Sequence, residues 1–239
     1  MRERPISVVP KSALVLLVLA LAAQAGWHFT HPPRPPIASN LPPPPSVASL
    51  ELSSIGEPIA MAKIWMLYLQ SFDSQPGVSV PFSKLDYGRM QKWLTLALKL
   101  DPPGQYPLFA ASRVYGDVAD PAKQRMMFDF VYQQFFVDPN RRWPWLAHAA
   151  VMTKHHLHDL PRARLYAQAI RQYATGKDVP SWAGQMEIFI LEDMNEYDSA
   201  RILLGGLLQS GQITDPHELR FLEERLNQIE AKAKSANNK

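Results

Sequence analysis

The sequence predicts an all-α protein in which one membrane-spanning helix precedes a body of packed helices. From about Ser54 onward, apolar residues recur every three or four positions and no long run alternates with period two, which is the pattern of helices. Prolines and glycines, 22 and 11 of them, mark the breaks between these runs. Ahead of the body, the 19 residues from Ser12 to Thr30 carry no formal charge. These three observations define the elements described below.

Composition excludes several classes of protein. The chain has no cysteine, which excludes a disulfide framework, a thiol nucleophile and a cysteine-ligated metal site. The net charge of +3 arises before residue 48, and the rest of the chain carries 21 basic and 21 acidic residues. Binding to nucleic acid needs a clustered excess of Lys and Arg. We therefore expect no nucleic-acid partner.

The N-terminal segment has the features of a signal anchor. Residues 12–30 are long enough, at 1.5 Å per residue, to cross a hydrocarbon core about 30 Å thick. Residues 1–11 contain Arg2, Arg4 and Lys11, and the positive-inside rule predicts that such a basic tail stays in the cytoplasm. The body is then expected on the periplasmic side of an inner (cytoplasmic) membrane.

A cleaved signal peptide is the alternative for this segment. Ala23-Gln24-Ala25 resembles a cleavage site, and cutting after Ala25 would release the body into the periplasm. Trp27, just past the apolar run, favours the anchor because an indole ring suits the membrane interface.

Residues 31–49 are predicted to be a proline-rich linker. Eight prolines fall between positions 32 and 45, and each one removes a backbone donor and fixes φ. The segment should be an extended polyproline II spacer, which at about 3.1 Å per residue would hold the body roughly 40 Å from the membrane. A docking peptide of the Pro-x-x-Pro type, from Pro32 to Pro35, is the alternative.

The body is expected to span residues 50–235, with a short disordered tail at 236–239. The periodic runs predict nine helices, at residues 57–71, 84–100, 106–117, 121–137, 143–157, 160–174, 180–194, 196–209 and 215–234. Start signals support two of them. Asp120 stands before Pro121 as a capping residue, and Asp215-Pro216 is followed by Glu218 in the position of a capping-box glutamate.

The helices show a repeat of 37 residues. The pairs Asp101-Pro102 and Asp138-Pro139 lie 37 residues apart and each follows an aromatic-containing helix. The segments around Ala163 and Ala200 match at the same spacing. Self-similarity with this period is typical of helical solenoids.

The repeat resembles the tetratricopeptide-repeat (TPR) family in the second helix of each unit. The matching positions are a turn acid, an apolar residue, a small residue three positions on and two further apolar residues: Asp159, Leu160, Ala163, Ala167 and Ile170 in one unit, and Glu196, Tyr197, Ala200, Leu204 and Leu207 in the next. First helices depart from the family pattern, so the match covers about residues 84–210. The resemblance implies a solenoid of about four helix pairs with a C-terminal capping helix.

The last predicted helix carries Leu219, Leu222, Leu226 and Ile229 at spacings of three, four and three. We expect it to cap the final pair, with its charged residues shielding the end of the solenoid. Weak self-association through the same stripe, as a short coiled coil, is the alternative.

The TPR resemblance also implies where a partner binds, because the first helices of that family line a groove that holds peptides. Carried onto the two matching units, it gives eight groove candidates: Trp145, His148, Met152, His155, Trp182, Gln185, Phe189 and Glu192. Exposed tryptophan is a frequent anchor of protein interfaces. The alternative is that the tryptophans are part of the core, which is favoured for Trp143.

Sequence motifs for catalysis are missing. The chain has no glycine-rich phosphate loop, no G-x-S-x-G elbow and no H-E-x-x-H pair. His155, His158 and Asp159 form the one polar cluster that suggests a metal, but a solvated helix end explains them equally well. We therefore expect neither a metal nor a cofactor.

These features predict a non-catalytic scaffold that is anchored in the membrane and binds a protein or peptide partner in the cell envelope. A hydrolase of the cell wall on an α-superhelical frame is one alternative, with Glu187 or Glu192 as its acid. A structural homo-oligomer built through the terminal helix is another.

Overall fold

The computed structural model describes residues 10–31, 38–75, 77–211 and 213–237. The regular structure is almost all helical, with two two-residue strands, which confirms the all-α prediction. The chain falls into two compact units that are described separately below. The basic residues Arg2 and Arg4 and the first four prolines of the expected linker lie outside the described residues. So do positions 238–239 of the expected tail.

The first unit contains α1 (Lys11–Thr30), a 20-residue helix with no buried side chain. It is the one described helix that is long and apolar enough to cross a membrane. After its last turn the ring of His31 stacks on Trp27, with 3.8 Å between the ring centroids. The apolar N-terminal helix is thus confirmed. Its orientation in a membrane and the alternative of cleavage after Ala25 stay predictions.

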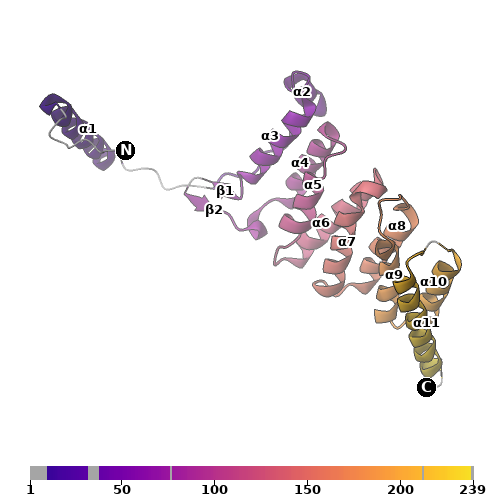
Figure 1. Cartoon of the computed structure of the whole chain (residues 1–239). Helices are drawn as coiled ribbons and strands as arrows, with labels where there is room; N and C mark the ends of the chain where they lie inside the picture. Colours follow the sequence, from indigo (N-terminus) through magenta and orange to yellow (C-terminus); the bar gives the residue numbers. More distant parts are fainter. Residues whose placement is uncertain (1–9, 32–37, 76, 212, 238–239) are drawn as a thin grey trace. The chain divides into compact units, whose positions relative to one another are not determined.

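The second unit, the helical body, contains all nine helices that the sequence predicts (Figure 1). In chain order these are α3 (Pro58–Gln70), α4 (Tyr87–Leu100), α5 (Tyr106–Phe109) with its π-helical continuation η3 (Ala110–Tyr115), α6 (Pro121–Phe135), α7 (Pro139–His155), α8 (Leu160–Tyr173), α9 (Ser181–Asp193), α10 (Tyr197–Gln209) and α11 (Pro216–Asn237). The sequence did not predict α2 (Val47–Ser53), the 3-10 turn η2 (Phe82–Lys84), or the two-residue strands β1 (Ser74–Gln75) and β2 (Val78–Ser79).

Aspartates begin several of these helices. Asp120 accepts hydrogen bonds from the backbone N–H groups of Ala122 and Lys123, and Asp215 caps α11 in the same way. These bonds satisfy N–H groups that have no partner within the helix. Glu218 does something other than complete a capping box, because its Oε1 accepts from the side chain of Gln185 on α9.

The helix boundaries differ from the prediction by up to four residues. Asp138-Pro139 begins α7 instead of ending α6, so α7 starts four residues earlier than expected and carries Pro144 in its interior. Proline is well tolerated in the first turn of a helix, which explains why this Asp-Pro pair opens the helix. At the other end, α11 continues to Asn237, beyond the predicted start of the disordered tail.

The helices of the body form two layers. Each helix from α6 to α11 packs against the next. Helix α7 also contacts α5, η3 and α9, which places these odd-numbered helices side by side in what we call the first layer. The even-numbered helices form the second layer, in which α4 contacts α6. Figure 1 shows α3 to α11 following one another as a row.

Hydrogen bonds between neighbouring helices of one layer recur at a nearly constant distance in sequence. Examples are Gln70 to Tyr106, Ser112 to His148 and Gln185 to Glu218, which are 36, 36 and 33 residues apart. In the second layer, Tyr166 Oη donates to Asp129, 37 residues earlier. These bonds therefore join helices that are one helix pair apart in the sequence.

The apolar core changes along the row. One large cluster, which includes Leu94, Leu108 and Phe128, fills the space from α2 to the start of α9. A second cluster around Leu204 and Ile229 joins the end of α9 to α10 and α11. Helix α9 is thus the element that links the two cores.

The packed body begins at Leu41, nine residues before the boundary expected from the prolines. Leu41 is buried, and its carbonyl accepts a hydrogen bond from Arg89 Nη1 at 2.7 Å. The carbonyl of Pro42 accepts from Trp93 Nε1 at 2.9 Å. Proline lacks a backbone N–H but keeps its carbonyl, so a proline-rich segment can accept a hydrogen bond from an indole N–H on a helix. The second half of the proline segment is therefore part of the body.

Candidate partner-binding face

The eight groove candidates lie on α7 and α9, but the structure gives them three different environments. His155 and Trp182 are exposed. Gln185 and Glu192 are buried. The remaining four are half-buried: Trp145, His148, Met152 and Phe189.

Two of the half-buried residues face the preceding helix of the layer. Trp145 Nε1 donates to Gln105 Oε1 at 2.7 Å, and its ring meets Phe109 edge to face with 5.6 Å between centroids. His148 Nδ1 is hydrogen-bonded to Ser112 Oγ at 2.9 Å, within the π-helical turn. These side chains hold α7 against α5 and η3, so most of their polar capacity is used inside the body.

The environment of His148 disfavours its charged form. Burial lowers the pKa of the imidazole below its ordinary value, and the nearby positive charge of Arg113 lowers it further. His148 is therefore a neutral hydrogen-bonding residue in the folded body at neutral pH.

Helix α11 covers the part of α9 that was expected to be groove. Gln185 donates to Glu218 Oε1 at 2.5 Å, and Glu192 pairs with Arg225 and Lys232. The guanidinium of Arg225 also lies 5.6 Å from the centroid of the Phe189 ring. In this structure the last helix of the chain itself occupies the position that a partner would take beside α9.

The open part of the first layer is formed by exposed residues of α7 and of α9. Trp182 is 51% exposed and meets Trp143 edge to face, with centroids 5.2 Å apart. His155 is exposed at the end of α7, and Lys154 beside it pairs with Asp193 of α9. We call Val151, His155 and Trp182 the open face.

Val151 was not among the sequence candidates, although it is 44% exposed. Its position could have been found, because it lies three residues after His148 and four before His155 on a helix with 3.6 residues per turn. An exposed β-branched apolar residue between two histidines adds an apolar contact to this face.

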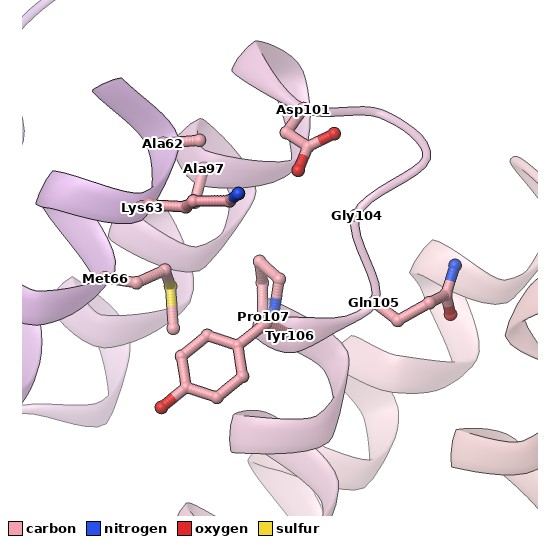
Figure 2. Close-up of a pocket in the computed structure, with 9 residues that line it drawn as sticks. All are labelled: Ala62, Lys63, Met66, Ala97, Asp101, Gly104, Gln105, Tyr106 and Pro107. Carbon is pink, nitrogen blue, oxygen red and sulfur yellow. The ribbon is translucent and has the colours of Figure 1, made fainter. Parts of the chain in front are cut away.

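A small pocket opens at the other end of the layer, between α3, the end of α4 and α5 (Figure 2). Its volume is about 230 Å³. Figure 2 shows Lys63 and Asp101 on one side of it, with Met66, Pro107 and Tyr106 on the other. The opening depends on Gly104, where an added Cβ would lie 2.5 Å from Asp101 Oδ2. This volume is below the usual 300–1,000 Å³ of small-molecule sites.

A larger cavity of about 540 Å³ lies between the end of α8, the loop after it, α9 and α10. Its apolar lining includes Ile188, Leu203, Leu207 and Ile213. Arg171 is at its edge, but its charge is already paired with Glu187 at 2.7 Å. The cavity thus lies beside α9, between the two clusters, and its lining is both apolar and polar.

The two glutamates that a hydrolase would use are both held in ion pairs. Glu187 is 1% exposed and lies 2.7 Å from Arg171 and 3.6 Å from Arg164. Glu192 is similarly buried beside Arg225. Both carboxylates are therefore engaged by arginine side chains within the helical body.

The histidine-rich turn after α7 has a structural explanation. Asp159 caps α8 by accepting from the backbone N–H of Arg162, and it also lies 3.9 Å from Arg125. Within the part of the chain that the structure describes, no group of three His, Asp or Glu side chains is arranged to hold a metal ion.

Comparisons of the chain with protein-family models, with curated proteins and with solved structures found no match. The function is therefore argued from the geometry above.

Proposed function

We propose that this protein is a membrane-anchored helical-repeat module, similar to TPR proteins in its arrangement, that binds a protein partner in the cell envelope on its open face. In this proposal the chain is a non-catalytic scaffold: α1 anchors it, and the body presents the binding surface on the periplasmic side of the inner membrane.

The repeat arrangement is supported by contacts between neighbouring helices of the same layer. Helix pairs α3–α4, α5–α6, α7–α8 and α9–α10 follow one another with α11 at the end, and equivalent hydrogen bonds recur 33 to 40 residues apart. A row of this kind buries each pair against its neighbours and leaves one surface of the first layer free along its length.

The observation that carries the binding proposal is the exposure of Trp182. Half of this large side chain lies in solvent, beside a second tryptophan that holds it in place. An exposed, preordered tryptophan gives a large apolar contact at a small cost in side-chain entropy, which is why it is common among the residues that dominate binding energy.

Photo-crosslinking followed by titration tests this proposal. A photoreactive residue at Val151, His155 or Trp182 of the full chain in native membranes should trap the same envelope protein, whereas one at Ile202 on α10, which is 68% exposed, should not. The trapped protein, once purified, should bind Trp182→Ala at least about 30-fold more weakly than the unmodified chain, as expected for an interface anchor worth 2 kcal/mol.

Ile202→Ala is the matched control in that titration, and its affinity should be unchanged. Equal trapping at Ile202 and at the open face, or an unchanged affinity of the Trp182 variant, would refute the binding face. Separately, protease digestion of intact and permeabilised cells tests the side of the membrane, and a body that is digested only from the cytoplasmic side would refute the periplasmic location.

A further inference from the structure

The corner where α2 meets α3 exposes three aliphatic side chains. Leu52 is 85% exposed and Ile55 is 91% exposed, while Ile59, at the start of α3, is half-exposed. Ile64 and Leu67 continue this exposed apolar surface along α3. Isolated exposed aliphatic residues are ordinary on a protein surface, but three within eight residues of one corner are not.

Ile55 is also held in a strained conformation. Its φ is +52°, in the left-handed region, and it precedes Gly56 at +85°. A β-branched residue rarely adopts a positive φ, because its Cβ crowds the following carbonyl at a cost of about 1–2 kcal/mol. The Ile55 side chain is almost fully in solvent, so the fold recovers none of this cost through burial.

The two ends of the helical row are protected differently. At the C-terminal end, α11 presents the exposed charged residues Glu223, Glu224 and Lys234 to solvent. At the N-terminal end, the exposed face of α3 carries Ile59, Ile64 and Leu67 beside the lone charge of Lys63. A terminal helix in a helical row normally has a polar outer face, and α3 lacks one. The N-terminal end is therefore built to meet an apolar environment.

The covalent connection between the anchor and the body is short. Only ten residues, 31–40, separate the end of α1 from Leu41, which is buried in the body. Ten residues span at most about 35 Å even when fully extended. A body on so short a tether stays within reach of the bilayer surface. Lipid is therefore an apolar environment that the body can contact.

We propose that the α2–α3 corner inserts Leu52, Ile55 and Ile59 into the interface of the bilayer that α1 crosses. This inference rests on the membrane anchoring in the proposed function. Glu51 and Glu57 are the charged residues of the corner, so the contact relies on apolar insertion. It is therefore independent of anionic lipid and insensitive to salt.

Fluorescent labelling of single cysteines tests the insertion, and the chain is well suited to it because it has no cysteine of its own. Full-length Ile55→Cys and Ile202→Cys, each carrying the environment-sensitive dye NBD, are placed in phosphatidylcholine nanodiscs with or without doxyl-labelled lipid. Ile202 is 68% exposed on α10 and is the matched control. We expect a blue-shifted emission and several-fold stronger quenching by the doxyl lipid at position 55 than at position 202.

Three results would count against the insertion, and they differ from a failure of the anchor. Equal quenching at both positions would refute it, and so would a contact at position 55 that appears only with anionic lipid. A disulfide between two Ile55→Cys chains in one nanodisc would assign the corner to a second copy. If instead alkaline carbonate extracts the unlabelled full chain from membranes, the anchoring itself is refuted.

Discussion

Arg225 of α11 donates from Nε to Oε1 of Glu192 on α9 at 2.8 Å, and Glu192 is buried while Arg225 remains about one-third exposed. Lys232 approaches the other carboxylate oxygen at 3.5 Å. The last helix is therefore fixed to the body by charge as well as by the apolar cluster of Leu204, Leu222 and Ile229.

Removal of the arginine should leave a buried carboxylate with one weak partner. We expect Arg225→Ala to lower the free energy of unfolding by about 2 kcal/mol, which is less than for a fully buried pair because Lys232 and solvent compensate in part. Urea unfolding of the full chain in detergent, followed by tryptophan fluorescence, measures this. Arg201→Ala, which removes an exposed pair within α10, should change it by less than about 0.5 kcal/mol. Similar effects of the two variants would contradict the assignment.

A second arginine links three helices through backbone carbonyls. Arg142 is 1% exposed, and it donates to the carbonyl of Gln134 near the end of α6 at 2.6 Å and to the carbonyl of Pro102 after α4 at 3.0 Å. Burial lowers the pKa of this guanidinium below its ordinary value, but the negative end of the α6 dipole favours the charge.

Arg142→Met keeps most of the volume of the side chain and removes both hydrogen bonds. We expect it to lower the free energy of unfolding by about 3 kcal/mol, because two part-buried carbonyls lose a charged donor. Arg141→Met is the control, since Arg141 is exposed and its two polar contacts are long, 3.4 Å to the carbonyl of Pro103 and 3.8 Å to Asp138. Urea denaturation that shows equal losses for the two variants would contradict this role of Arg142.

Much of the fold could be predicted because its signals are local. The three-and-four spacing and the capping aspartates at Asp120 and Asp215 depend on residues within one helix, and each of the nine predicted helices is present. The start of the body could not be predicted, since the carbonyls of Leu41 and Pro42 accept hydrogen bonds from Arg89 and Trp93, some 50 residues away. Composition alone shows only that this segment is rich in proline.

The candidate site was harder to predict for the same reason. A repeat pattern shows which face of α7 and α9 belongs to the first layer, but it does not show what covers that face. Gln185 and Glu192 are buried only because α11 returns over them, and Trp145 is tied to Gln105 across the layer. These contacts join residues 33 to 40 positions apart, beyond the range of any motif.

The stability of the body should depend on pH through His148. The unfolded chain takes up a proton at this residue near the ordinary pKa of 6.5, whereas the folded body does so only at a lower pH. Below about 6.5 the unfolded state therefore binds more protons, and stability falls as the pH falls. We expect the melting temperature to drop between pH 7.5 and pH 5.5, and to drop less in His148→Gln. Thermal melts at both values measure this, and an equal drop in the variant would exclude His148 as a source.

The strain at Ile55 gives a prediction of the opposite sign. Asparagine adopts positive φ more readily than isoleucine, and the Ile55 side chain has almost no buried contact to lose. We expect Ile55→Asn to raise the free energy of unfolding of the full chain in detergent by about 1 kcal/mol, or the melting temperature by about 2–4 °C. Ile202→Asn is the matched control: it replaces another exposed isoleucine, inside α10, where asparagine is a poorer helix former, and should lower stability slightly. A loss of stability in both variants would show that Ile55 is not strained. The strain at Ile55 would then no longer support a role for this side chain in membrane insertion.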